Sequence, residues 1–330
     1  MRRNCELLLL VVCLALTLGC GAEKGGSASG AMKYRLAVIP KGTTHEFWQS
    51  VHFGAAKAAG ERSDVEIIWK GPLTESDRDA QISLVEDFVT KRVNGICLAP
   101  LDSQALLKSV AGAKDQNIPT VIFDSALADE RDIVSYVATD NFRCGAMAAR
   151  HMAKLLNEHG KIILLRYTPG SESTEQREQG FLETLKEFPN IVQLSTNQYS
   201  GTSFEESHTV AQQMLLKFGD EADGVFTVCE PNSTGMLRAL EARDKNARKI
   251  RFIAFDPNAR LIQGMRDGRV DGIVLQDPVE MGYQAVKTLI DRLEGKEVAK
   301  RIQIAEYIAT PENMNEPEMV KLLTPERFKD

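Results

Sequence analysis

The feature that most constrains the fold is a regular alternation of short apolar runs with longer segments of helical periodicity. The runs YRLAVIP, VEIIWK, GICLAP and PTVIFD begin near residues 34, 65, 95 and 119. The segments HEFWQSVHFGAAKAAGE, DRDAQISLVEDFVTKR and SQALLKSVAGAKDQ lie between them and place apolar residues at helical spacing. A strand–helix–strand unit of about 30 residues is typical of a parallel sheet with right-handed crossovers.

The alternation pauses at IVSYVATDN (133–141) and then restarts with KIILLRY, IVQLSTNQY, GVFTVCE, IRFIAFD and DGIVLQD. Helices are expected near 142–157, 173–187, 203–217, 232–244 and 258–267. Two consecutive sets predict an α/β fold with two doubly wound parallel-sheet lobes joined by a multi-strand hinge. A chain of 330 residues also exceeds what one core usually fills.

The predicted lobe boundaries follow from where the pattern breaks. We expect the N-terminal lobe to comprise residues 34–138 and 278–300, and the C-terminal lobe to comprise 139–277 and 301–330. The connection at 138–141 is one hinge candidate. Another lies at Gln276-Asp277, before the long helical segment PVEMGYQAVKTLIDRLEG, and the tail RIQIAEYIAT holds one more strand-like run.

The first twenty residues have the pattern of a secretory signal peptide. Arg2 and Arg3 precede an almost wholly apolar run that is too short for a comfortable membrane span. LTLGC resembles a bacterial lipobox, with Thr17 where Leu is usual, and predicts a lipid anchor on Cys20 of the mature protein. The alternative is ordinary cleavage near Ala22 with a free product. Residues 21–33 are rich in Gly, Ser and Ala and predict a flexible tether.

Composition excludes several functions. Hydrophobic content of 43% and charged content of 26% are ordinary for a globular protein, and the net charge of −6 comes from interspersed acids and bases. Without a basic block, nucleic acid is not an expected partner. Cys97, Cys144 and Cys229 are far apart and odd in number, so their spacing predicts neither a metal site nor a disulfide framework. Cys97, in the apolar run GICLAP, is expected to be a buried free thiol. No cofactor is expected.

Polar residues gather where the apolar strands end. These ends carry DS (124–125), CE (229–230), FD (255–256) and QD (276–277), and GTTHEFW follows the first strand. Ligands of open α/β sheets bind beyond the carboxyl ends of strands. Aromatic faces can pack on the C–H face of a sugar ring, and carboxylates and amides can hold its hydroxyls. The pattern therefore predicts a cleft for a small polyhydroxylated ligand.

The order and spacing of EFWQSVHFGA, IPTVIFDS, VATDN, STEQREQGF, STGMLRAL, FIAFD and IVLQDPVEMG resemble the bacterial type I periplasmic sugar-binding proteins, especially the ribose-binding branch. The resemblance runs from about Tyr34 to about Thr310. It implies a non-enzymatic solute-binding protein of an ABC importer, which captures a monosaccharide between its lobes. Its partner would be an ABC permease of the inner membrane, and its location the periplasm or cell surface.

The resemblance also assigns site residues. Phe47 and Trp48 match ring-stacking aromatics, Tyr199 falls where the ribose branch stacks a phenylalanine, and Arg177 matches a hydrogen-bond donor of the second lobe. The full set of expected ligand-binding residues is Lys41, His45, Phe47, Trp48, Asp124, Arg177, Tyr199, Glu230, Asp256 and Gln276.

Three positions depart from that branch. Ser125 stands where an arginine is typical, Cys229 (followed by Glu230) replaces an asparagine, and His45 replaces another. These changes alter the donor pattern, so the resemblance does not specify ribose.

Structural roles are open alternatives for several site residues. Phe47 could instead be a core residue of its helix. Two neighbours on a helix point in different directions, so Trp48 could point away from the ligand. Asp124 and Asp256 are alternative helix caps. Arg177 could instead be a solvated charge on its helix. Trp69 is a packing residue in one interpretation and a residue at the rim of the site in the other.

The sequence bears on three other functions. A hydrolase would show motifs such as G-x-S-x-G or H-E-x-x-H, and neither occurs. A transcription repressor with this fold would begin with a helix-turn-helix, where this chain has a signal and tether. A sensory lipoprotein working with a membrane kinase stays an alternative to the importer.

Overall fold

The computed structural model describes residues 33–243 and 249–328. The predicted signal peptide, Cys20 and residues 21–32 of the tether lie outside the described residues. Over those residues, no helix is both long enough and apolar enough to cross a membrane.

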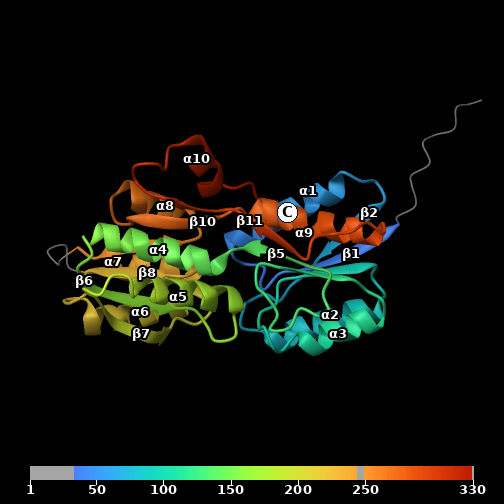
Figure 1. Cartoon of the computed structure of the whole chain (residues 1–330), viewed down its shortest axis with the longest axis horizontal. Coiled ribbons are helices and arrows are strands. Elements are labelled where there is room, and N and C mark those ends of the chain that lie inside the picture. Colours follow the sequence, from blue (N-terminus) through green and yellow to red (C-terminus); the bar gives the residue numbers. More distant parts are fainter. Residues whose placement is uncertain (1–32, 244–248, 329–330) are drawn as a thin grey trace, which may run out of the picture. The chain divides into compact units, whose positions relative to one another are not determined.

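The first lobe is built on a six-stranded sheet whose described pairs are all parallel, in the order β11-β5-β4-β3-β1-β2. Its central strands are buried along their whole length, as expected for a sheet covered on both faces. Figure 1 shows α1 and α9 over one face and α2 and α3 over the other. The elements are β1 (Tyr34–Ile39), α1 (Glu46–Gly60), β2 (Val65–Trp69), α2 (Arg78–Thr90), β3 (Gly95–Leu98), α3 (Leu107–Asp115), β4 (Thr120–Phe123), β5 (Ser135–Thr139), α9 (Pro278–Leu293) and β11 (Arg301–Ile304).

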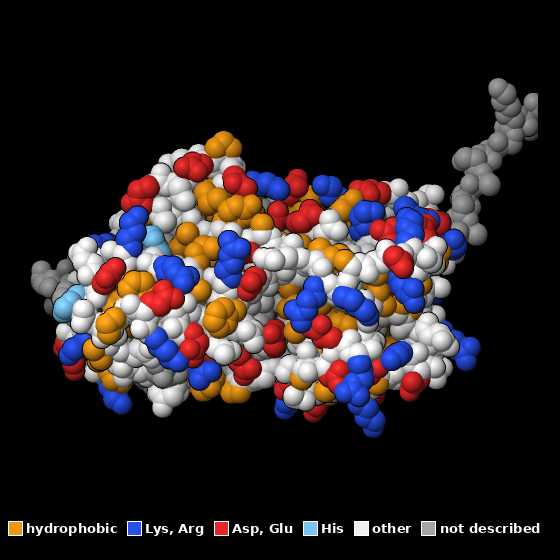
Figure 2. Space-filling model, viewed as in Figure 1, with side chains coloured by type: hydrophobic (Ala, Val, Ile, Leu, Met, Phe, Trp, Pro, Cys, Tyr) orange, Lys and Arg blue, Asp and Glu red, His pale blue; other side chains and the backbone are white. Residues whose placement is uncertain are grey.

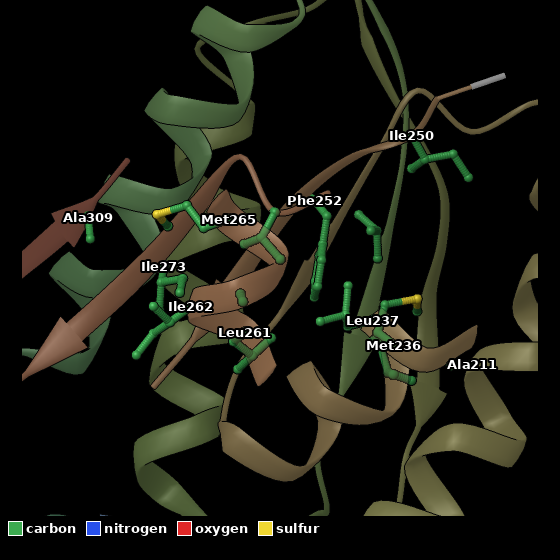
Figure 3. Close-up of a cluster of buried hydrophobic side chains, with 14 of the residues drawn as sticks. Ala211, Met236, Leu237, Ile250, Phe252, Leu261, Ile262, Met265, Ile273 and Ala309 are labelled. Atoms are coloured by element: carbon green, nitrogen blue, oxygen red, sulfur yellow. The ribbon is translucent and has the colours of Figure 1, made fainter. Parts of the chain in front are cut away.

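The second lobe repeats this plan with the order β12-β10-β9-β8-β6-β7, in which β12 runs antiparallel to β10. Helices α4 and α5 pack together, as do α6 and α7. The apolar faces of α7, α8 and β9 meet in the core drawn in Figure 3, where Leu237, Leu261 and Phe252 lie close together. The elements are α4 (Asn141–Leu155), β6 (Gly160–Arg166), α5 (Glu172–Leu185), β7 (Ile191–Tyr199), α6 (Phe204–Phe218), β8 (Gly224–Thr227), α7 (Glu230–Glu241), β9 (Arg251–Phe255), α8 (Ala259–Arg266), β10 (Gly272–Gln276), β12 (Glu306–Ala309) and α10 (Pro317–Leu323).

Both lobes contain a pair of helices that pack backbone to backbone through glycines. A Cβ atom added to Gly145 of α4 would lie 1.9 Å from the Arg177 carbonyl oxygen, and one added to Gly180 of α5 would lie 1.9 Å from that of Phe142. Gly54 of α1 and Gly282 of α9 make the same reciprocal contact in the first lobe. Only glycine permits this approach, which fixes α1 and α5 at the edge where the strands end.

The chain passes between the lobes three times before α10, and this corrects one predicted boundary. The crossings at 139–141 and 276–278 match the two hinge candidates. The third was missed, because the run RIQIAEYIAT is two strands: β11 pairs with β5 in the first sheet and β12 with β10 in the second. Residues 301–304 therefore belong to the N-terminal lobe, and the crossing is at Ala305.

The end of the described chain also returns to the first lobe. Helix α10 packs in the core of the second lobe, but Phe328 beyond it donates its backbone N–H to the Gln49 carbonyl at 3.1 Å. Its ring stacks on His52 with centroids 3.8 Å apart, and Arg327 pairs with Glu46 at 2.6 Å. The tail is thus a further connection between the lobes, which the predicted assignment of 301–330 to the second lobe did not include.

Candidate functional site

A cavity lies where the carboxyl ends of strands from both sheets face each other. The open space inside it is about 30 Å³, which holds a few water molecules and is far below the roughly 300–1,000 Å³ of ligand pockets. A ligand with several heavy atoms therefore needs the side chains or the lobes to move apart before it can enter. The lining residues are Lys41, His45, Phe47, Trp48, Glu75, Asp124, Tyr167, Ser173, Thr174, Arg177, Cys229, Glu230, Pro231, Asp256 and Gln276.

Nine of the ten expected site residues line this cavity, and Tyr199 does not. Tyr199 ends β7, the edge strand of the second sheet, whose pairing with β6 contains two register shifts. Its side chain is 38% exposed, with the Arg166 guanidinium 4.6 Å from the ring centroid. Tyr167, directly after the neighbouring β6, lines the cavity instead.

The aromatic pair after β1 forms one wall. The rings of Phe47 and Trp48 meet edge to face, with centroids 4.9 Å apart and planes at 82°. Trp48 is 3% exposed and packs against Phe123 of β4, whereas Phe47 is only partly buried. Both rings line the cavity, so the helix does not force one of them away from it. This wall supplies the apolar face of the site.

Glu75 ties this wall together, and sequence reasoning missed it. Its carboxylate lies 2.8 Å from His45 Nδ1 and accepts hydrogen bonds from Trp48 Nε1 at 2.7 Å and from the Tyr167 hydroxyl at 2.9 Å. Burial disfavours both charges of the pair. Their mutual attraction outweighs it, lowering the pKa of Glu75 to about 2 and raising that of His45 to about 9. Glu75 lies in a loop after β2 with no strand-end signal.

Lys41 and Asp124 form a buried ion pair on the first lobe. The Lys41 Nζ lies 2.9 Å from Asp124 Oδ2 and also donates to Ser173 at 2.9 Å and Ser171 at 3.3 Å in the second lobe. Asp124 has φ of 63° and is followed by a loop and β5. It does not cap a helix: the N-cap of α4, the next helix, is Asp140. Lys41 therefore contacts both sides of the cleft.

Arg177 comes from α5 and is buried rather than solvated. Its Nε donates to Asn141 Oδ1 at 2.8 Å and its Nη1 to the Val228 carbonyl at 2.9 Å, and the guanidinium lies 3.9 Å from the centroid of the Phe255 ring. These contacts fix the orientation of the guanidinium along the cavity wall. Neither the partner Asn141 nor the carbonyl of residue 228 was anticipated from the sequence.

Asp256 and Gln276 end adjacent strands of the second sheet. Gln276 Nε2 donates to Asp256 Oδ1 at 2.9 Å, and the Thr139 hydroxyl donates to Gln276 Oε1 at 2.9 Å. Burial raises the pKa of Asp256 to about 6, partly offset by the charge of Arg177. The N-cap of α8 is Asn258, which accepts from the Leu261 N–H at 3.0 Å. The capping alternative for Asp256 is therefore wrong.

Glu230 begins α7 and reaches across the cleft. Its Oε2 accepts the Phe47 backbone N–H at 3.2 Å. Burial raises its pKa to about 7, with the charge of His45 opposing the rise. The preceding Cys229 also lines the cavity, and burial raises the pKa of its thiol well above the usual value, so the thiol stays neutral.

The arrangement suits a ligand with several hydroxyl groups. Cationic side chains (Lys41, His45, Arg177) and carboxylates (Asp256, Glu230) line the cavity together with the aromatic wall. Each hydroxyl can donate to a carboxylate and accept from a cation, which makes charge-assisted bonds in a nearly dry site. Within residues 33–243 and 249–328, no group of three or more His, Cys, Asp or Glu side chains could hold a metal ion.

The model of the periplasmic binding protein domain family matches residues 36–297. The chain belongs to this family. This confirms the predicted fold class of two α/β lobes and the resemblance to type I periplasmic sugar-binding proteins. Family membership implies an extracytoplasmic location and a binding protein rather than an enzyme.

Relatives of this periplasmic binding protein span nearly the same length. It is 27% identical to the ribose import binding protein RbsB of Bacillus subtilis, over 89% of this chain and 94% of that protein. A solute-binding protein of an ABC transporter from Agrobacterium vitis, with bound D-fucose, is 32% identical with a TM-score of 0.84, covering 88% of this chain and all of that one. A carbohydrate transporter solute-binding protein from Agrobacterium radiobacter, in complex with D-arabinose, is 27% identical with a TM-score of 0.84, covering 88% and 99%.

Proposed function

We propose that the protein captures a monosaccharide in the cavity between its lobes and presents it to an ABC permease of the inner membrane. The observation that carries the proposal is the cavity itself. It is small and lined from both lobes, and it combines the Phe47–Trp48 wall with cationic and carboxylate side chains. An aromatic wall fits the C–H face of a sugar, and the charged side chains fit its hydroxyls.

The ligands of the relatives support a monosaccharide without specifying ribose. The named ligands are a pentose in one case, a deoxyhexose in another and ribose in a third. The ribose-binding branch typically has an arginine donor where this chain has Ser125. The Ser125 hydroxyl already accepts the Ser173 N–H at 3.0 Å. His45 and Cys229 change two further contacts. A sugar with a different hydroxyl pattern from ribose fits these substitutions.

Import is favoured over sensing by the relatives, which are a ribose import binding protein and a solute-binding protein of an ABC transporter. The proposal includes export by the signal peptide of residues 1–20, a lipid anchor on Cys20, and the tether of residues 21–33. An anchored binding protein stays near its permease, which raises its effective concentration there.

A thermal-shift screen tests the proposal. Purified protein is heated with pentoses, hexoses, deoxysugars and inositols, each at a saturating concentration. A ligand that binds only the folded protein stabilises it by about 2.7 kcal/mol at one hundred times its Kd, so we expect a clear rise in Tm for one or a few sugars. A complete panel without any shift would contradict the proposal.

A further inference from the structure

Two helices that begin at the cleft, α1 in the first lobe and α5 in the second, lack side-chain caps of their own. The first backbone N–H groups of a helix need acceptors from outside the helix. In α6, Ser203 supplies one by accepting from the Glu206 N–H at 3.2 Å. The N-cap residues of α1 and α5, His45 and Ser171, make no such side-chain bond.

The missing acceptors come from the opposite lobe. Glu230, at the start of α7, accepts the N–H of Phe47 in α1 at 3.2 Å. Ser125, directly after β4, accepts the N–H of Ser173 in α5 at 3.0 Å. Phe47 and Ser173 occupy the same position, the second residue of their helices. Each lobe therefore caps a helix of the other at an equivalent place.

We propose that Ser125 and Glu230 are closure residues, which cap a helix across the cleft only when the lobes are together and so hold the protein closed on its ligand. The inference rests on the proposed function, because it needs a ligand that drives closure. When the lobes separate, both N–H groups return to water. When they meet, Ser125 and Ser173 are each only 1% exposed, and an N–H left there without an acceptor would be costly.

Both caps lie beside the ligand. Glu230 and Ser173 line the cavity. A sugar hydroxyl that donates to the second oxygen of Glu230 fixes the carboxylate in its capping position. Ligand binding and capping then favour the same closed state, which is the condition for a ligand to shift a conformational equilibrium.

Each cap contributes a modest share of closure, since other bonds also cross between the lobes. The Tyr167 hydroxyl donates to Glu75 at 2.9 Å, and the Ala126 N–H donates to Glu172 at 2.9 Å. These bonds remain when Ser125 is changed. The expected effect is therefore a faster release of ligand rather than loss of binding.

The test compares Ser125→Ala with Ser203→Ala. Both remove a serine hydroxyl that caps a helix, but Ser203 acts within its own lobe and is not one of the residues that line the cavity. Affinity and dissociation rate for the sugar that binds wild type are measured by calorimetry and stopped flow, and Tm is measured without ligand. Ser125→Ala should weaken affinity about fivefold, the equivalent of one helix cap, through faster dissociation. Its ligand-free Tm should match wild type.

Ser203→Ala should show the reverse: a lower ligand-free Tm and unchanged affinity. Wild-type affinity in Ser125→Ala, or an affinity loss accompanied by the same fall in Tm as Ser203→Ala, overturns the inference and leaves the proposed function standing. A wild-type protein that binds no sugar overturns both.

Discussion

Replacing Asp256 by Asn should make the closed conformation, in which this carboxylate is buried, more stable and should make the ligand bind more weakly. The carboxylate is 5% exposed and takes one hydrogen bond from Gln276. Asn keeps the size, keeps an oxygen for Gln276, and tolerates the left-handed φ of 57°. Only the charge and one acceptor are lost.

The magnitude of the stability gain follows from the raised pKa of Asp256. The unfolded chain ionises this group at about pH 4, whereas burial delays ionisation in the folded protein to about pH 6. Between these values the folded state binds more protons, so wild-type stability falls as pH rises. Above pH 6 the full penalty is about 3 kcal/mol. Asp256→Asn should therefore be more stable at pH 8 by about 1–3 kcal/mol, and the difference should vanish below about pH 4.

Ligand affinity should move in the opposite direction. A hydroxyl bonded to a carboxylate contributes about 1.5–3 kcal/mol, so loss of the charge should weaken binding at least tenfold. Urea unfolding at pH 4 and pH 8 and calorimetry with the bound sugar measure both effects. Asp115→Asn, on an exposed residue that ends α3, is the control and should change neither. Unchanged affinity, or lower stability at pH 8, would refute the reasoning.

The remaining predictions concern the aromatic wall, its acidic support and the anchor. Phe47→Ala should weaken sugar binding by about 1–3 kcal/mol through lost apolar contact, measured by calorimetry, whereas Phe142→Ala, outside the cavity lining, should not; equal affinities would exclude Phe47 as a platform. Glu75→Gln breaks a buried pair and should cost about 3 kcal/mol at pH 6. The lowered pKa of Glu75 and the raised pKa of His45 make the pair's contribution complete between about pH 4.5 and pH 6.5. It is lost as pH rises through about 9, and the variant should lack this decline; parallel pH profiles of urea unfolding would contradict it. Cys20→Ser should move the protein from the membrane to the soluble fraction, and a wild type that is already soluble would exclude the anchor.

Much of the site could be predicted because parallel strands bring their carboxyl ends to one edge. Residues after β1, β4, β9 and β10 therefore meet without any long-range information. Glu75 and Tyr167 were missed for different reasons. Glu75 lies in a loop, and a loop has no hydrophobic periodicity from which the position of a side chain could be predicted. Tyr167 follows a strand end, but the resemblance pointed to Tyr199, which lies on an exposed edge strand and outside the cavity lining.

The hinge shows a second limit of sequence patterns. The pattern of apolar residues at 301–309 is that of a single strand, yet its two halves, β11 and β12, pair with different sheets. A strand pattern indicates that a strand forms but not which sheet it joins, and Ala305 between the halves is not a turn residue. The reciprocal glycine contacts between helices could not be predicted from the sequence either, since a glycine inside a helix indicates only a weaker helix.

On the face shown in Figure 2, basic and acidic side chains are interspersed. This mixture is what the interspersed acids and bases of the sequence lead one to expect on that face.

Tryptophan fluorescence offers the most direct test of sugar capture in the cavity. The chain has two tryptophans: Trp48 lines the cavity, whereas Trp69 stacks on His52 with ring centroids 4.4 Å apart and is not in the lining. Trp69→Phe leaves Trp48 as the only reporter. Titration with the sugar found in the thermal screen should give a saturable change in Trp48 emission, with the same Kd as calorimetry. Saturation by calorimetry with no change in Trp48 emission would show that the sugar binds elsewhere and would contradict the account.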